Sequence, residues 1–149
     1  MDEQSFIIWQ VGLGSIEDFI EMAGTLFETA TDVLLPEYQE LLRREDAVIF
    51  VAYEDQRAVG FAQCELRSDY VEGTTTSPVG YLEGIYVKPE YQKQGIAKQL
   101  LVQCENWARQ MGCQEFGSDC TLDNEASYHF HSAEGFQEVN RLITFTKKL

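Results

Sequence analysis

Residues 81–97 read YLEGIYVKPEYQKQGIA, the pattern of a strand followed by a turn and a helix. Apolar and β-branched residues over 79–87 predict a strand, which Lys88-Pro89-Glu90 ends because proline cannot donate to a strand ladder. A helix is expected to begin near Gly95 and to end at Gly112. Its apolar positions are spaced by four, four, three and four residues, the pattern of one buried helix face: Ile96, Leu100, Cys104, Trp107 and Met111.

The connection between this strand and this helix has the features of an anion site. The first backbone N–H groups of a helix have no partner inside it, and they lie at the positive end of the helix dipole. We expect the N–H groups of residues 94–97 to point toward an anion, with Gly95 allowing a close approach because it has no Cβ. The residues follow neither GxGxxG nor GxxxxGKS/T, so a Rossmann dinucleotide site and a P-loop are excluded.

Outward from this segment the chain predicts further strands and helices. Before it come a strand over 5–11, a helix capped by Ser15 over about 16–30, a short helix over 36–42, and a hairpin of strands over 47–54 and 58–67. After it come a short strand around Phe116, a helix over about 123–134, and one or two antiparallel strands over 138–147. The order β-α-α-β-β-β-α-β-α-β predicts an α/β fold, with a mixed, mostly antiparallel sheet flanked by helices.

The composition is that of one folded domain. With 149 residues, of which 44% are hydrophobic and 24% charged, the chain can build a single packed core, so we expect one domain over 1–149. Its formal charge of −14 would repel nucleic-acid phosphates and attract polycations, so a DNA- or RNA-binding role is excluded. The longest apolar run covers only 47–53, and no basic and apolar leader is present, so no signal peptide or membrane span is expected.

The four cysteines, at positions 64, 104, 113 and 120, form no CxxC pair and have no histidine at metal-ligand spacing. We therefore expect no metal site. Reduced thiols are typical of cytoplasmic proteins, and we expect this chain in the cytoplasm.

The motif Gln92-Lys93-Gln94-Gly95-Ile96-Ala97 resembles the Q/R-x-x-G-x-G/A pyrophosphate loop of the GNAT superfamily of N-acetyltransferases. The preceding V-x-P-x-Y-Q and the following helix match as well. Asn124 lies eleven residues before Gly135-Phe136, as in the last helix of that family and its Gly-Phe exit. Together these features cover about residues 79–136. The resemblance implies the GNAT fold and acetyl-coenzyme A as the acetyl donor.

Four shorter segments resemble the aminoglycoside 6'-N-acetyltransferases within this superfamily. They are Asp69-Tyr70-Val71-Glu72-Gly73, Ser77-Pro78-Val79, Leu82-Glu83-Gly84-Ile85 and Ser118-Asp119. Aminoglycosides are polycations, and a chain with a net charge of −14 suits them on physical grounds. The resemblance thus implies transfer of an acetyl group to the 6'-amine of an aminoglycoside, which confers antibiotic resistance.

For the donor, the resemblance implies three sets of contacts. Backbone N–H groups of the strand would hold the thioester carbonyl and the pantetheine arm, the loop would bind the pyrophosphate, and Asn124 would hydrogen-bond the pantetheine arm. Lys93 and Lys98 would add positive charge, although solvated surface lysines look the same, and Asn124 serves equally well as a helix cap. The expected donor residues are Ile85, Tyr86, Val87, Gln92, Lys93, Gln94, Gly95, Ile96, Ala97, Lys98 and Asn124.

Acetyl transfer needs proton removal from the acceptor ammonium and a proton for the leaving thiolate. The resemblance assigns the first task to Glu83, directly or through water; the alternative is a surface glutamate at a strand end. Many relatives carry a tyrosine four residues before the glycine of Gly-Phe, and here that position is His131, with Tyr128 one turn earlier. Histidine titrates near neutral pH, so His131 or Tyr128 is the candidate acid, and protonation by solvent stays open.

For the acceptor we nominate side chains that can hold ammonium, hydroxyl and sugar-ring groups: Phe27, Tyr70, Glu72, Glu83, Asp119 and Glu138. Phe27 fits a core position at helical spacing as well. Two rival functions remain. One is acetylation of a polyamine or a protein amine, and the other is a non-catalytic acyl-coenzyme A-binding module, against which Glu83 and Asp119 argue. The resemblance also suggests a homodimer, which an exposed tail strand would serve.

Overall fold

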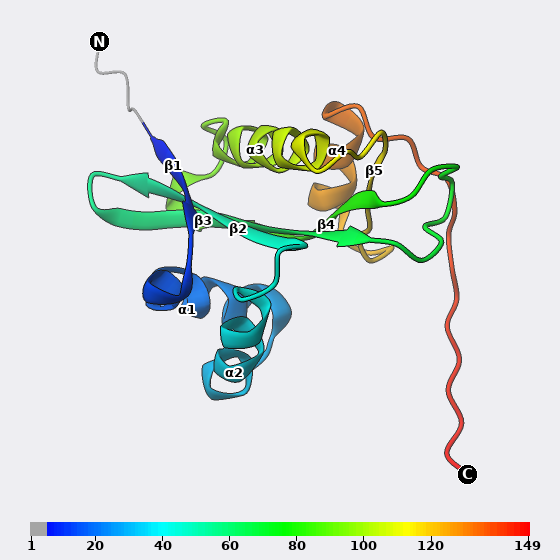
Figure 1. Ribbon diagram of the computed structural model, residues 1–149, viewed down its shortest axis with the longest axis horizontal. Helices are drawn as coiled ribbons and strands as arrows, with labels where there is room; N and C mark the ends of the chain where they lie inside the picture. Colours follow the sequence, from blue (N-terminus) through cyan, green and yellow to red (C-terminus); the bar gives the residue numbers. More distant parts are fainter. Residues whose placement is uncertain (1–5) are drawn as a thin grey trace.

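The computed structural model describes residues 6–149 and places one sheet between two layers of helices (Figure 1). The sheet holds β1 (Ile7–Val11), β2 (Ala47–Glu54), β3 (Arg57–Arg67), β4 (Val79–Val87) and β5 (Phe116–Ser118), in that spatial order. Strands β1 to β4 are antiparallel to their neighbours, and β5 runs parallel to β4. The mixed, mostly antiparallel sheet confirms the predicted fold class.

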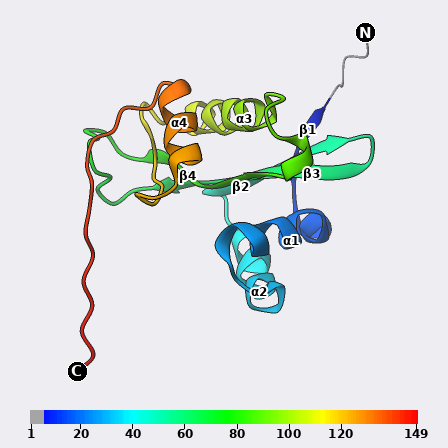
Figure 2. The same cartoon turned by 180° about the vertical axis from the view of Figure 1, so that it is seen from behind.

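Helices α1 (Ile16–Phe27) and α2 (Thr31–Leu41) cover one face of the sheet, and α3 (Ile96–Gln110) and α4 (Glu125–Ala133) cover the other (Figure 2). Short 3-10 turns, Leu13–Ser15 and Pro89–Tyr91, precede α1 and α3. Within residues 6–149, no helix combines the length and the apolar character needed to cross a membrane.

Alternation of side chains along the strands fills a core on each face of the sheet. In β2, Val48, Phe50 and Ala52 pack on the side of α3, whereas Ile49 and Val51 pack toward α1 and α2. This period of two is that of a strand buried on both faces.

The buried face of α3 follows the predicted spacing except at its end. Ile96, Leu100, Cys104 and Trp107 are buried against the sheet. Met111 lies beyond the last helical residue and is 39% exposed, so its prediction as a core residue was wrong. The helix ends one residue before it, and the buried stripe ends with the helix.

The second helix is longer than predicted, because it begins at Thr31 and contains Pro36. A proline there has no N–H to donate to the preceding turn, which removes one helical hydrogen bond. Leu34, Tyr38 and Leu41 bury one face of α2 against the core. Burial of large apolar side chains stabilises by about 1.5–3 kcal/mol each, which offsets the lost bond.

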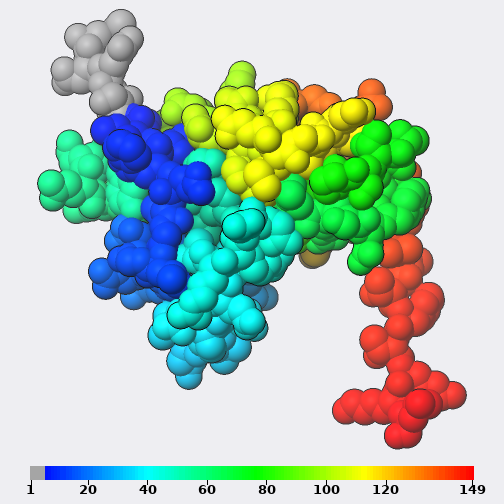
Figure 3. Space-filling view, in the orientation of Figure 1, coloured from blue at the N-terminus to red at the C-terminus, as the bar shows by residue number. Residues whose placement is uncertain are grey.

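The tail contradicts the prediction of one or two strands over 138–147. No helix or strand follows Phe136 in the described chain. The side chain of Val139 lies against Gly73 of the β3–β4 loop, and the end of the chain then extends away from the body (Figure 3). Val139, Leu142, Ile143 and Phe145 are between 59% and 87% exposed. A strand forms only when its backbone groups pair with an edge, and this segment meets no edge of its own chain.

Candidate functional site

Strands β4 and β5 pair over a short stretch and then separate. Gly80, Tyr81 and Leu82 face Phe116, Gly117 and Ser118, and the pairing ends there. Strand β4 continues to Val87 and stays paired with β3 on its other side. Within the described chain, the main-chain groups of residues 83–87 that face away from β3 are therefore open to an extended ligand, except the carbonyl oxygen of Val87, which accepts a hydrogen bond from Gln92. The predicted donor residues Ile85, Tyr86 and Val87 lie on this open stretch.

Glu83 lies at the mouth of this opening, in a β-bulge. Gln63 of β3 pairs with Gly84, and the next residue, Cys64, pairs with Leu82, so Glu83 is an extra residue in β4. A bulge bends its strand and re-aims a side chain out of the regular alternation. The Glu83 side chain is 19% exposed, so its carboxylate is sheltered but reachable.

A basic and an aromatic side chain surround the Glu83 carboxylate. Arg67, at the end of β3, donates from Nη2 to Oε1 at 2.7 Å and from Nε to Oε2 at 3.0 Å. Its Cζ lies 3.5 Å from the centroid of the Tyr81 ring, and the Tyr81 hydroxyl donates to Asp119 at 2.5 Å. The bond to Glu83 raises the pKa of Arg67, and burial, with the bond to Asp119, raises the pKa of Tyr81. These four side chains form one connected line across β3, β4 and the end of β5.

The connection before α3 carries two residues with left-handed backbone. Lys93 has a φ of 63°, and Gly95, the N-cap of α3, has a φ of 83°. In the part of the chain that the structure describes, no side chain caps α3, and its first turn holds no acidic residue. The first N–H groups of the helix are therefore uncompensated, and a Cβ built on Gly95 would meet nothing within 4 Å. An uncapped, open helix N-terminus behind a left-handed turn fits a pyrophosphate.

Gln92 ties this loop to the end of β4, because its Nε2 donates to the carbonyl oxygen of Val87 at 3.1 Å. Lys93, Gln94 and Lys98 are exposed beside it, whereas Ile96 is buried and anchors the helix. The structure thus brings the predicted donor residues of the strand and the loop together in one strand–turn–helix unit.

His131 contacts β5 at the point where β4 and β5 separate. Its Nε2 is 2.7 Å from the hydroxyl of Ser118, the last paired residue of β5. Its Nδ1 is 2.7 Å from the carbonyl oxygen of Ser127, one turn earlier in α4. A carbonyl oxygen only accepts, so in the neutral imidazole Nδ1 carries the hydrogen and Nε2 accepts from Ser118. In that tautomer Nε2 has no proton to give.

The other nominated residues of α4 and the tail contact different partners. The Tyr128 hydroxyl donates to Oε2 of Glu138 at 3.2 Å, and Arg141 also bonds Glu138. The bonds from Arg141 and Tyr128 lower the pKa of Glu138. The Oδ1 of Asn124 accepts from the N–H of Ser127 at 3.0 Å, so Asn124 caps α4, its alternative role. Tyr128 and Glu138 therefore meet at the base of the tail.

Phe27 ends α1 next to the bulge. A Cβ on Gly84 would lie 2.7 Å from Cζ of Phe27, so the ring lies directly against the backbone beside Glu83. Phe27 is 37% exposed, unlike a core residue. It lines a cavity of about 280 Å³ together with Thr29, Leu34, Glu37, Tyr38, Leu41 and Gln63. The Phe27 ring therefore combines partial exposure with a position against the backbone of the residue that follows Glu83.

Tyr70 and Glu72 lie in the loop between β3 and β4. Tyr70 is 75% exposed, and Glu72 is exposed as well. Glu115 holds the loop by accepting hydrogen bonds from the N–H groups of Thr75 and Thr76 and from the Thr76 hydroxyl. These bonds lower the pKa of Glu115. The loop is anchored at its second half, and its nominated residues face solvent.

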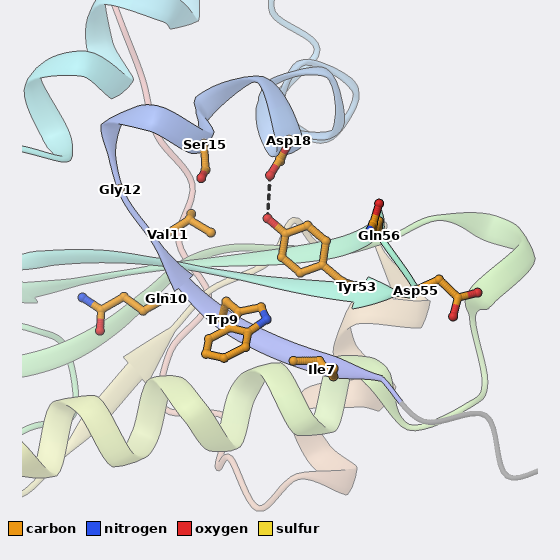
Figure 4. A pocket seen from close by; sticks show the side chains of 10 residues that line it. All are labelled: Ile7, Trp9, Gln10, Val11, Gly12, Ser15, Asp18, Tyr53, Asp55 and Gln56. Atoms are coloured by element: carbon orange, nitrogen blue, oxygen red, sulfur yellow. Dashed lines mark hydrogen bonds between the residues drawn. The ribbon is translucent and has the colours of Figure 1, made fainter.

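A larger cavity, of about 440 Å³, lies at the opposite edge of the sheet, between β1, the start of α1 and the β2–β3 turn (Figure 4). Tyr53 donates to Asp18 there at 2.6 Å, and Trp9 is 60% exposed along its wall. None of the residues nominated from the sequence lines this cavity. The candidate site is therefore the β4–β5 opening.

Arg67, Tyr81 and Ser118 belong to this site but were not nominated. For Ser118 a signal existed, because it precedes Asp119 in one of the segments quoted above. For Arg67 none existed, since a basic residue at the end of a strand normally faces solvent. Arg67 meets Glu83 only because β3 pairs with β4.

Known proteins resemble the chain over most of its length. The model of the acetyltransferase (GNAT) family matches residues 16–136. An aminoglycoside N(6')-acetyltransferase type 1 from Acinetobacter haemolyticus is 41% identical over 135 residues, which are 91% of this chain and 93% of that protein. The crystal structure of aminoglycoside antibiotic 6'-N-acetyltransferase AAC(6')-Ih from Acinetobacter baumannii has a TM-score of 0.91 at 38% identity, covering 97% of this chain and 99% of its own. The structure of AAC(6')-Iy in complex with the bisubstrate analog CoA-S-monomethyl-acetylneamine has a TM-score of 0.92 at 34% identity, covering 97% of this chain and 99% of its own.

Proposed function

The chain belongs to the GNAT family of acetyltransferases, and we propose that it moves an acetyl group from acetyl-coenzyme A to the 6'-amino group of aminoglycosides, conferring resistance to these antibiotics. The observation that carries the proposal is the position of Glu83. It is bulged out of β4 where β4 leaves β5, on the strand that leads into an uncapped helix N-terminus. Such a carboxylate lies beside the opening that suits an extended anionic donor.

The donor side of the site is built mainly from backbone. Acetyl-coenzyme A supplies an activated acyl group and a negatively charged pyrophosphate. The N–H groups of residues 94–97 would bind the pyrophosphate, and the open stretch of β4 over 85–87 would pair with the pantetheine arm. Lys93 and Lys98 would add positive charge from exposed positions. Asn124 uses its Oδ1 as a cap, which leaves its amide nitrogen to donate to the arm.

Glu83 acts as the general base in this proposal. Its carboxylate takes a proton from the 6'-ammonium, directly or through a water, and the neutral nitrogen then attacks the thioester carbonyl carbon. The new N–C bond forms and the C–S bond breaks, while a backbone N–H of the open β4 stretch donates to the carbonyl oxygen. A positioned base of this kind contributes about 10²–10⁴-fold in rate.

His131 and Ser118 are best placed to protonate the departing thiolate. When Nε2 of His131 carries a proton, its bond to Ser118 reverses, and the Ser118 hydroxyl hydrogen can turn toward the opening. Ser118 then gives its hydrogen to the sulfur and receives the proton of Nε2. Tyr128 fits this step less well, because its hydroxyl donates to Glu138 at the base of the tail.

The acceptor side is acidic and partly aromatic. Glu83 and Asp119 supply carboxylates beside the opening, and Phe27 supplies a ring against which a sugar can lie. Tyr70 and Glu72 would add contacts from the exposed loop. The net charge of −14 attracts a polycation over the whole surface, which favours aminoglycosides over neutral acceptors.

We also propose a homodimer in which each tail pairs with the partner subunit. Residues 139–149 carry three basic residues, Arg141, Lys147 and Lys148, and no acidic one. The rest of the chain is strongly acidic, and β5 is an edge strand. An extended, basic segment with exposed apolar side chains complements the edge and the charge of a second copy.

A cytoplasmic location is a further part of the proposal. The structure leaves Cys64, Cys104, Cys113 and Cys120 as free thiols, which persist in a reducing compartment. Cell fractionation with an antibody against the chain tests it, and recovery from an oxidising compartment would contradict it.

Thiol release from acetyl-coenzyme A tests the proposed function. Kanamycin-type aminoglycosides that bear or lack a 6'-amine are assayed beside spermidine and a peptide. We expect turnover only with the 6'-amine. Preferred turnover of spermidine or the peptide would change the acceptor, and coenzyme A binding without turnover of any amine would indicate an acyl-coenzyme A-binding module.

A further inference from the structure

Arg67 holds Glu83 more firmly than an ordinary surface ion pair does. Two nitrogens of one planar guanidinium reach both Glu83 oxygens, at 2.7 Å and 3.0 Å. Two parallel bonds between planar groups fix their relative orientation, which a lysine ammonium cannot do. The Glu83 carboxylate is therefore held in one plane.

The guanidinium is itself supported by a buried ring. Its Cζ lies 3.5 Å from the centroid of Tyr81, which is 7% exposed and bonded through its hydroxyl to Asp119. The Arg67 side chain is 42% exposed on its other side. Stacking on a fixed ring stabilises a guanidinium in one place and limits the freedom of its long side chain.

The pair of Arg44 and Asp46 shows the difference. There one nitrogen of Arg44 contacts one oxygen of Asp46 at 2.8 Å, the two side chains are 41% and 51% exposed, and another Arg44 nitrogen turns to a different carboxylate, Glu65, at 3.0 Å. Exposed pairs of this kind stabilise by roughly 0–1 kcal/mol and do not hold a side chain in one geometry. The Arg67–Glu83 pair differs from the Arg44–Asp46 pair in three ways. It has a second hydrogen bond, its guanidinium stacks on the Tyr81 ring, and its carboxylate is only 19% exposed.

We propose that Arg67 is a positioning residue for acetyl transfer: it holds the Glu83 carboxylate in the orientation from which Glu83 takes the acceptor's proton. The inference rests on the proposed function and adds to it a residue that does not touch the reacting atoms. An ionised carboxylate offers about four lone-pair directions. Arg67 donates to the lone pairs of Glu83 that face it, and the remaining lone pairs are left for the acceptor's ammonium group or a bridging water.

Steady-state kinetics of Arg67→Ala and Arg67→Lys test this role. We expect kcat with a 6'-amine aminoglycoside to fall roughly ten- to hundred-fold in Arg67→Ala, because a misplaced catalytic group costs up to about 10²-fold. KM for acetyl-coenzyme A should stay unchanged. Arg67→Lys keeps the positive charge and loses the two parallel hydrogen bonds, so its kcat should lie between that of the wild type and that of Arg67→Ala. Guanidinium chloride added to Arg67→Ala should restore part of kcat and should not raise that of the wild type.

Arg109→Ala is the matched control, because it removes the same charge from an exposed position on α3. Thermal melting and coenzyme A calorimetry on each variant separate misfolding from misplacement, and Arg67→Lys decides the question if Arg67→Ala does not fold. An inactive wild type would overturn the proposed function and this inference with it.

An active wild type with full kcat in Arg67→Ala would overturn the inference alone. So would a lower aminoglycoside KM at unchanged kcat in Arg67→Ala, together with inhibition of that variant by guanidinium. That result would mean that Arg67 competes with the acceptor ammonium for Glu83.

Discussion

Glu83 has its place in the site because it is itself the extra residue of the β-bulge in β4. In an unbulged strand, neighbouring side chains would alternate strictly between the two faces, and Glu83 would be paired across to β3. The insertion between the partners of Gln63 and Cys64 frees it at the point where β5 departs. The bulge and the strand ends thus bring the side chains of Arg67, Glu83 and Asp119 close to one another.

We predict that Glu83→Gln lowers kcat by about 10²-fold or more, since the amide keeps the shape of the side chain but cannot take a proton. Thiol-release kinetics with a 6'-amine aminoglycoside measure it. Glu17→Gln, which neutralises an exposed carboxylate on α1, is the control for lost charge. A Glu83→Gln enzyme with nearly full turnover would end the assignment of Glu83 as the base.

We predict that His131→Ala and Ser118→Ala each lower kcat by roughly ten-fold or more, because both interrupt the path of the proton to the thiolate. Tyr128→Phe should lose less, because its hydroxyl is bonded to Glu138. The three variants are compared at saturating substrate. Equal rates in all three and in the wild type would instead support protonation by solvent.

At the scale of the element, the two ends of α3 use glycine for different purposes. Gly95 begins the helix with a φ of 83°, and Gly112 follows it with a φ of 90°. A Cβ at either position would meet nothing within 4 Å, so both substitutions cost mainly backbone strain. Only the first lies at the N-terminus, where the N–H groups are unpaired.

We predict that Gly95→Ala and Gly112→Ala destabilise the fold by similar amounts, about 1–2 kcal/mol for a left-handed residue with a Cβ. Only Gly95→Ala should weaken coenzyme A binding in calorimetry, because only there does the Cβ enter the anion site. Equal affinities in the two variants would argue against pyrophosphate binding at this turn.

The loop between β3 and β4 depends on the charge of Glu115. Its pKa in the folded chain lies below the ordinary value of 4.5, because Thr75 and Thr76 donate hydrogen bonds to the ionised carboxylate. The stabilisation is therefore complete above that ordinary value and is lost as the pH falls through the lower folded value. We predict that the protection of the Thr75 and Thr76 amides, measured relative to their intrinsic exchange rates, falls in that acid range, and that it is also lower in Glu115→Gln at neutral pH. Unchanged exchange by NMR in the variant would show that other contacts hold the loop.

At the scale of the whole molecule, the C-terminal tail extends away from the body of the protein (Figure 1). The body is acidic, and residues 139–149 are basic. The helix layers bury the sheet on both faces, but the tail keeps its apolar side chains in solvent. Exposed apolar segments with unpaired backbone are those that pair with other chains.

We predict that a chain ending at Phe136 loses the dimer, because it lacks the extended segment that would pair with the partner. Sedimentation of the full chain and of the shortened chain measures this. The isolated body should keep its fold, since core residues precede the cut. A shortened chain that still sediments as a dimer would locate the interface elsewhere.

The elements around the deciding stretch were predictable because their signals are local. Strands β2 and β4 have the predicted bounds, and α3 begins one residue after Gly95. Each rests on a short-range rule: apolar alternation, a proline that ends a strand, or a glycine that begins a helix. The turn that carries the nominated donor loop was predictable for the same reason, since its residues are consecutive, whereas donor binding by that loop stays a prediction.

The sequence-based predictions were wrong or incomplete where the structure depends on contacts between segments that are far apart in the chain. Helix α2 continues through Pro36 because Leu34, Tyr38 and Leu41 pack against the core. The tail forms no strand because it meets no sheet edge of its own chain. The register of β3 against β4 inserts Glu83 as a bulge and places Arg67 against it, and the end of β5 places Ser118 against His131.

The sequence by itself therefore determined the strand–turn–helix unit and the acidic charge, and it nominated Glu83 as the base, because periodicity and motif lie within a short length of chain and composition needs no fold. Only the tertiary structure decided what surrounds that base and which tautomer His131 adopts. Contacts between residues far apart in sequence depend on the register of paired strands and on the docking of α4, and neither is encoded in any single segment.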